Sequence, residues 1–319
     1  MPTSRVRPTA RPLAVATALV IALAACSSSD GQNGSGQSEP AIGDVPVLLD
    51  SATLRFPLDT YVPTSAQRAA LAEAQDVLID QCMKRYGYRF ALRKGRSSGG
   101  DNTLRYGVSS PERAARYGYE NPELANRPQK PPARQMGPNE KLVLHGEAQV
   151  DPSKPVPMSQ EEAENSELGV ITVAGQKVPA GGCSREGFLK LYAPTRDSVD
   201  IMVPQNFGMD AYARSQEDSR VREAIKGWSA CMAKAGYETD DPVSPQNDLG
   251  FADTTLDGSK AVSAATKDVA CKKETNLVGI WSTVETAYQK RLIEQNAETL
   301  DNARKQLETR LKLAAQLTT

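Results

Sequence analysis

The sequence predicts a mainly α-helical fold with a small β-hairpin, braced by disulfides and ending in a long C-terminal helix. Three observations predict it. Apolar residues recur at helical spacing in several separate segments. Aromatic residues make up only 5% of the chain, so alanine supplies much of the core. Four cysteines follow residue 26, and an even set in an exported chain indicates disulfides.

The first strong helix is predicted to begin after Thr64. Thr64 and Gln67 have the spacing of a capping box, in which each side chain satisfies a backbone N–H group of the other residue. Gly87 is a natural end, because glycine accepts the left-handed conformation that follows many helices. One face between these ends carries the apolar residues Leu71, Ala74, Val77, Leu78 and Cys82.

Two further helices carry the same kinds of signal. Residues 111–117 form a short one, with Ser110 as the N-cap, a proline in the first turn and Gly118 at the end. Another starts near Ser219 and ends at Gly236. Its apolar face comprises Val221, Ile225, Trp228 and Met232.

Helical spacing continues almost to the C-terminus, which predicts one long helix over residues 263–317. Straight, it would span about 80 Å, longer than a domain of this size is wide, so we expect that it either breaks or projects at its end. A five-residue step between Tyr288 and Ile293 shifts the apolar stripe, so we expect a bend or a change of face there. We favour packing of this helix on the first and third helices; projection into a partner or a coiled coil is the alternative.

The remaining segments are less regular. A hairpin is predicted from strand-forming residues at 170–173 and a return strand from 177–178. Prolines are frequent over 121–158, which favours an irregular surface connection. The acidic stretch 161–167 is expected to form a helical turn, and 240–259 a loop.

The first 25 residues have the three parts of an export signal. Arg5, Arg7 and Arg11 give a positive front, and residues 13–25 form an apolar run too short for an ordinary membrane-spanning helix. The run closes as Leu-Ala-Ala directly before Cys26. This pattern resembles the lipobox of bacterial lipoproteins, whose cysteine is acylated before the signal is cut.

The resemblance implies a signal peptide over 1–25, a flexible polar tether over 26–44 and a single extracytoplasmic domain over 45–319. Diacylglycerol on Cys26 would anchor the chain in the lipid bilayer, on the outer face of the cell membrane. Three of the 38 basic residues leave with the signal, so 35 remain against 39 acidic ones, a net charge of −4. A chain with this net negative charge is not expected to bind nucleic acid.

Acylation of Cys26 leaves four cysteines, which allow three disulfide connectivities. We favour Cys82–Cys183 with Cys231–Cys271, because each half of the chain then closes its own loop. A zinc site is the rival use of four cysteines, but no Cys-x-x-Cys pair occurs, so we predict no metal site and no cofactor.

Two short patterns repeat. Cys-Met-x-x-x-Gly-Tyr occurs at 82–88 and 231–237, each at the end of an amphipathic helix, and Arg-Tyr-Gly occurs at 85–87, 105–107 and 116–118. Both patterns have a structural explanation, in which glycine ends a helix or turn and an aromatic ring covers it. Tyrosines beside arginines could also form a stacking or partner-binding surface. Its candidate residues are Tyr86, Tyr88, Tyr106, Tyr117 and Tyr119.

These motifs together resemble a group of uncharacterised lipoproteins from high-GC Gram-positive (actinobacterial) bacteria. The resemblance rests on residues 54–59, the two Cys-Met-x-x-x-Gly-Tyr motifs, Gly181-Gly182-Cys183 and the stretch 271–281. It implies a shared fold and a surface location, and it brings no activity.

Residues that could support catalysis are few. His145 is the sole histidine, and no Gly-x-Ser-x-Gly nucleophile elbow occurs, so serine or cysteine hydrolase chemistry is not expected. The acidic residues of stretches such as 161–167 and 240–257 read as solvated surface. We therefore expect a non-catalytic protein that binds an envelope protein or a cell-wall component. The alternatives are a solute-binding lipoprotein of a transporter and a hydrolase with an unrecognised carboxylate site.

Overall fold

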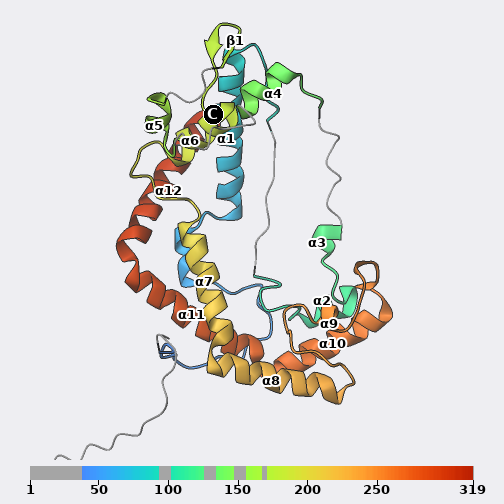
Figure 1. Cartoon of the computed structure of the whole chain (residues 1–319). Helices are drawn as coiled ribbons and strands as arrows, with labels where there is room; N and C mark the ends of the chain where they lie inside the picture. Colours follow the sequence, from blue (N-terminus) through green and yellow to red (C-terminus); the bar gives the residue numbers. More distant parts are fainter. Residues whose placement is uncertain (1–37, 93–101, 126–133, 147–155, 167–170, 319) are drawn as a thin grey trace, which may run out of the picture. The chain divides into compact units, whose positions relative to one another are not determined.

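The computed structural model describes residues 38–92, 102–125, 134–146, 156–166 and 171–318, and it is mainly helical with one two-stranded sheet in the described ranges (Figure 1). The predicted fold class is confirmed. The elements, in chain order, are η1 Pro57–Tyr61, α1 Ser65–Arg85, α2 Pro111–Tyr117, α3 Pro122–Ala125, α4 Pro138–His145, α5 Gln160–Glu164, β1 Thr172–Val173, β2 Gln176–Lys177, α6 Gly182–Tyr192, α7 Val203–Glu217, α8 Ser219–Lys234, α9 Pro245–Asp248, η2 Asp253–Thr255, α10 Ser259–Glu274, α11 Leu277–Gln295 and α12 Ala297–Thr318.

The capping signals predicted the helix ends well. Thr64 and Gln67 form the expected capping box at the start of α1. The Ser110 side chain accepts from the backbone N–H of Arg113 at the start of α2, and Gly118 ends that helix with a positive φ of 57°. Local side-chain chemistry is therefore sufficient to fix these boundaries.

Five α-helices of the described ranges were not predicted: α3, α4, α6, α7 and α9, the last within the stretch 240–259 that was expected to be a loop. The three longest are α4, α6 and α7. The α4 helix interrupts the proline-rich connection, with Pro138 in its first turn, where a proline costs no hydrogen bond. The α6 and α7 helices lie between the hairpin and Ser219, a stretch with no predicted element. Each of the three buries apolar residues against another helix, so packing stabilises segments whose local signals are weak.

The C-terminal region is three helices rather than one. The chain breaks at Asn276, which adopts a positive φ of 50°, and again at Asn296. The Asn276 side chain accepts from the N–H of Leu48 and donates to the carbonyl of Pro46, so it is held outside the helical conformation. At the five-residue step between Tyr288 and Ile293 the α11 helix is continuous, and the helical run is interrupted only at Asn296.

The last helix, α12, packs mainly on α1, with smaller contacts to η1, α6 and α7, and in Figure 1 it runs beside α1. Leu300, Ala303 and Ala314 of α12 are buried. The expectation that the end of the chain packs on the first helix is therefore confirmed. The expected packing on α8, the third predicted helix, is made by α10 and α11, which cover the earlier part of the predicted long helix.

Two disulfides connect the helices. Cys82 of α1 is joined to Cys183 of α6, and Cys231 of α8 is joined to Cys271 of α10. These are the pairs favoured from the sequence. Each disulfide lies in a different apolar cluster, the first with Val143 of α4 and the second with Trp228 of α8.

The compact unit runs from Glu39 to the C-terminus, so it starts before residue 45. The Glu39 carboxylate accepts from the N–H and hydroxyl of Ser219, and the Pro40 carbonyl accepts from Arg220. The last part of the predicted tether is thus bound to the start of α8. Within the described ranges, no helix has both the length and the apolar character needed to cross a membrane.

Candidate functional site

An open pocket of about 500 Å³ lies between η1, the 102–108 segment, α7 and α11. Its walls combine aromatic rings, amides, one guanidinium and one carboxylate. They include Phe56, Asp59, Arg105, Gly208, Tyr212 and Gln289. A pocket of this volume and composition has the size of a small-molecule site.

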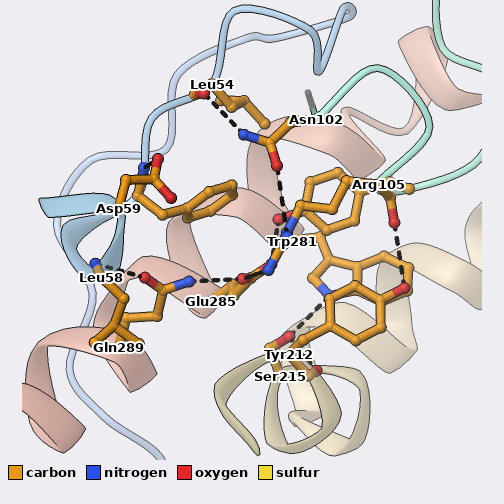
Figure 2. Close-up of polar contacts among 12 residues, drawn as sticks. Leu54, Leu58, Asp59, Asn102, Arg105, Tyr212, Ser215, Trp281, Glu285 and Gln289 are labelled. Atoms are coloured by element: carbon orange, nitrogen blue, oxygen red, sulfur yellow. Dashed lines mark hydrogen bonds and ion pairs between the residues drawn. The ribbon is translucent and has the colours of Figure 1, made fainter. Parts of the chain in front are cut away.

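Arg105 lies at the centre of this pocket wall. Its guanidinium carbon is 4.5 Å from the centroid of the Phe56 ring and 5.3 Å from that of Tyr212. Its Nε donates to Glu285 over 2.9 Å, and its Nη2 makes a second bond to the same carboxylate. Figure 2 shows this pairing, which fixes the orientation of the guanidinium.

Glu285 is fully buried behind the pocket. Besides Arg105, it accepts from the Tyr106 hydroxyl over 2.7 Å and from the Gln289 amide over 2.8 Å. Gln289 in turn accepts from the backbone N–H of Leu58, which ties η1 to α11 (Figure 2). The carboxylate therefore acts as the centre of a hydrogen-bonded network that spans three segments of the chain.

This network sets the charge states of the pocket. Burial lowers the pKa of Arg105, but the Glu285 carboxylate outweighs burial and raises that pKa. Burial and Glu285 together raise the pKa of Tyr106 well above its ordinary value, and they raise the pKa of Tyr212 to about 12. At neutral pH the arginine is charged and both phenols are neutral.

Three aromatic rings pack against one another here, with Tyr212 in the pocket wall and the buried Tyr106 and Trp281 behind it. The centroid of Trp281 is 4.9 Å from that of Tyr106 and 5.5 Å from that of Tyr212. The Trp281 indole N–H donates to the Ser215 hydroxyl over 2.8 Å, and Ser215 donates to the carbonyl of Tyr212. The pocket floor is therefore preformed and rigid.

Gly107 explains why the chain can turn here. It has a φ of 75°, and a Cβ at this position would lie 2.2 Å from the carbonyl oxygen of Pro242. Only glycine allows this close approach without displacing the backbone. The second Arg-Tyr-Gly motif thus gives an ion pair, a buried ring and a tight turn in three successive residues.

The five candidate tyrosines do not form one surface. Tyr86, Tyr106 and Tyr119 are buried, and Tyr88 and Tyr117 are half-buried. Tyr86 and Tyr88 pack in the cluster around Cys82, Tyr106 packs beside Trp281, and Tyr119 lies against Phe251. The interpretation as a shared binding surface is therefore corrected. The buried rings belong to three separate parts of the core, and of the five tyrosines only Tyr106 belongs to the Glu285 network behind the pocket.

The residues considered for catalysis lie at the surface or stabilise a loop. His145 is exposed at the last position of α4 rather than in a loop. Asp241 accepts from the N–H groups of Val243 and Ser244, and Asp248 accepts from the Thr239 hydroxyl, so both stabilise the loop. The described residues contain no group of three or more side chains arranged to hold a metal ion.

Sequence reasoning missed the carboxylate that matters most here. Glu285 follows Trp281 by four residues and precedes Gln289 by four, so all three share the buried face of α11. An acidic residue within an apolar stripe was the available signal. Its partner Arg105 lies 180 residues away in sequence, and spacing cannot reveal that contact.

The lipidation candidate Cys26, the signal peptide and most of the tether lie outside the described residues. Comparison with known protein families, with curated proteins and with solved structures finds no match to this chain.

Proposed function

We propose that this chain is a membrane-anchored, extracytoplasmic lipoprotein that binds its ligand without catalysis. The observation that carries the binding role is the Arg105 pocket. Its guanidinium and the carboxylate behind it are bonded to each other, and its aromatic floor is stacked. Such a preformed wall favours affinity, because little side-chain freedom is lost when a ligand enters.

The pocket chemistry indicates the kind of group it accepts. Phe56 and Tyr212 offer aromatic surface, Gln205 and Gln289 line the same space with amides, and Arg105 adds a guanidinium whose charge is balanced by Glu285. An uncharged apolar or planar group suits these walls. The polar groups would fix its orientation.

The cellular address rests on Leu-Ala-Ala-Cys26 and the apolar run before it. Metabolic labelling with an alkyne analogue of palmitate tests it. The wild-type chain should incorporate the label and partition with membranes, and the Cys26→Ser variant should do neither. Equal labelling of both chains would refute the anchor.

A pocket-filling variant tests the binding role. Gly208 of α7 lines the pocket, and a Cβ there meets no atom within 4 Å, so Gly208→Phe should fill the space without disturbing the fold. Ala213→Phe, at an exposed position of the same helix, is the matched control.

Native mass spectrometry of the protein isolated from its own envelope should show a bound ligand or partner. The wild type and Ala213→Phe should retain it, and Gly208→Phe should lose it. Retention by Gly208→Phe, or an empty wild type, would count against the pocket.

A receptor for a transporter is the second candidate, and the small-molecule size of the pocket favours it. The described residues lack the alternating strands and helices typical of two-lobed solute receptors. Crosslinking on intact cells separates the candidates. Capture of a permease supports the receptor, and capture of a wall-synthesis or secretion protein supports an envelope partner.

A further inference from the structure

A second pocket, of about 290 Å³, adjoins the Arg105 pocket. It lies between the end of η1, the first turns of α1, the segment before α7 and the middle of α12. Val62, Pro204 and Gln205 line both pockets, so the two form neighbouring parts of one groove.

The second pocket contains a buried arginine with an unusual set of partners. Arg310 is 7% exposed, and its Nη2 donates to the carbonyls of Tyr192 and Val199 over 2.8 and 2.9 Å. The same nitrogen lies 3.2 Å from the Gln306 amide oxygen. These acceptors are all neutral. None of the described carboxylates forms an ion pair with Arg310, whereas Arg105 has Glu285.

A buried cation without a counter-ion is costly, because carbonyl dipoles replace only part of the lost hydration. Burial accordingly lowers the pKa of Arg310, although Tyr192 and Asp200 oppose the shift. Asp200 acts on Arg310 only through the electrostatic field, and an anion that entered the pocket would supply the direct ion-pair partner that the described residues do not. The site is thus preorganised for a negative group.

The charges around Arg310 favour the same conclusion. Arg68 also lines the pocket, where it donates to the Pro63 carbonyl and the Ser65 hydroxyl. Asp200 is the one carboxylate in the lining described, and its Oδ1 accepts from the N–H of Met202. The lining thus brings two guanidinium groups and one carboxylate to the same pocket.

The rest of the lining is apolar. Leu71, Ile201 and Leu307 line the second pocket, and Met202 and Met209 are exposed at the second and first pockets, 40% and 61% respectively. Flexible methionines at a rim adapt to the shape of an aliphatic chain. The groove therefore has a guanidinium end at Arg310 and an aromatic end at Phe56, where the carboxylates of Asp59 and Glu285 accompany Arg105.

We propose that this groove binds a single-chain amphiphile with an anionic head group, its head at Arg310 and its chain directed towards Phe56 and Tyr212. The proposal rests on the binding role given to the Arg105 pocket, and it names the ligand class. A free fatty acid and a single-chain phospholipid share this chemistry.

Fluorescence displacement with the full chain tests the head group. Dodecanoate and dodecan-1-ol differ only at the head, and the wild type should bind dodecanoate at least tenfold more tightly. Arg310→Gln should remove this preference while leaving the alcohol affinity unchanged. Arg304→Gln, an exposed arginine of the same helix, is the control and should behave as the wild type.

If Arg310→Gln fails to fold by circular dichroism, Arg68→Gln takes its place, since this arginine is less buried. It should reduce the preference for dodecanoate severalfold. Equal affinity of the wild type for the acid and the alcohol would overturn the proposal. So would a preference for the acid that survives in the arginine variants.

Two further arms complete the test. The affinities for lauroyl-lysophosphatidylglycerol and for dodecanoate distinguish a phospholipid from a free fatty acid as the natural ligand. Tighter binding of the lysophospholipid would assign a phospholipid head group, and tighter binding of dodecanoate would assign a free fatty acid. Gly208→Phe should weaken hexadecanoate but leave octanoate unchanged, because only the longer chain reaches the first pocket. If the wild type keeps a native ligand that Gly208→Phe loses, yet binds no amphiphile, the binding role stands and the ligand class is wrong.

Discussion

At the scale of single residues, Glu285 connects the parts of the candidate site. It is fully buried and accepts from Arg105, Tyr106 and Gln289, which come from two distant segments of the chain. A buried carboxylate is tolerated because its charge is paired and its oxygens are hydrogen-bonded. Loss of its charge should therefore affect stability as well as binding.

Glu285→Gln is expected to destabilise the protein by about 3 kcal/mol, the low end of the range for breaking a buried ion pair, because Arg105 keeps some access to water. Urea unfolding measures the change. Glu294→Gln, at an exposed position of the same helix, should change stability by less than about 0.5 kcal/mol. A similar loss in both variants would argue against the buried pair.

Gly107→Ala should be more harmful than Gly87→Ala. Both glycines have a positive φ, 75° and 79°, so both substitutions carry a similar backbone strain of about 1 kcal/mol. The added Cβ meets the Pro242 carbonyl at 2.2 Å in the first case and no atom within 4 Å in the second. Chemical denaturation should show a difference of at least about 1 kcal/mol between the variants. Equal losses of stability in the two variants would mean that the Pro242 segment moves away from the added Cβ without cost.

At the scale of the elements, the two Cys-Met-x-x-x-Gly-Tyr motifs form the same helix end. The N–H of Tyr88 donates to the carbonyl of Met83, and the N–H of Tyr237 donates to that of Met232, each over 3.1 Å. The disulfide partners differ, because Cys183 lies at the start of α6 and Cys271 near the end of α10. The shared pattern is thus a local solution for ending a helix, and it does not extend to the surrounding arrangement.

Asp218 links two elements, since it caps α8 and accepts from the Tyr288 hydroxyl of α11. Burial raises the pKa of this carboxyl, but hydrogen bonds from Arg220 and Tyr288 outweigh burial, and the pKa lies below its ordinary value of 3.8. The charged form is therefore the one that stabilises the fold. Its contribution is complete above the unfolded-state pKa and is lost as pH falls through the folded-state pKa.

Asp218→Asn keeps a capping side chain and removes the charge. At neutral pH it should cost about 1–2 kcal/mol, as expected for hydrogen bonds to a charged group. The difference in unfolding free energy between the variant and the wild type should narrow as pH falls below about 4, because the wild-type carboxylate then becomes protonated. Unfolding free energies measured across this range check the trend. Asp301→Asn, in an exposed pair with Arg304, should give a small and flat difference.

The sequence predicts helix ends better than it predicts contacts. The caps at Thr64 and Ser110 depend on side chains within three residues, so their signals are local. The pairing of Arg105 with Glu285, and the approach of Gly107 to Pro242, depend on segments far apart in the chain. The fold class could therefore be read from periodicity and cysteine number. The pocket could not, because it is created by long-range packing.

At the scale of the whole molecule, the described core consists of four apolar clusters connected by shared helices, and two of the clusters each contain a disulfide. The α1 helix contributes to two of them, one with Cys183 and one with Ala314 of α12. The C-terminal helix is thus an integral part of the core around α1. It also carries Arg310, so the anion-binding end of the groove depends on it.

Deletion of residues 297–319 should therefore destabilise the protein strongly. It would expose Leu71 and Leu191, which are 3% and 1% exposed, and remove the buried Leu300. Burial of such side chains contributes about 2 kcal/mol each, so we expect the melting temperature to fall by about 10 °C or more. The newly exposed apolar face should also promote self-association.

Size-exclusion chromatography with light scattering, together with thermal melts, measures both effects. Deletion of residues 318–319 alone is the control, because these lie beyond the last buried position of α12, Ala314. The control should remain as stable as the full chain and should keep its oligomeric state. A monomeric protein of unchanged stability after removal of all of α12 would contradict its packing on α1, and it would detach Arg310 from any role in the groove.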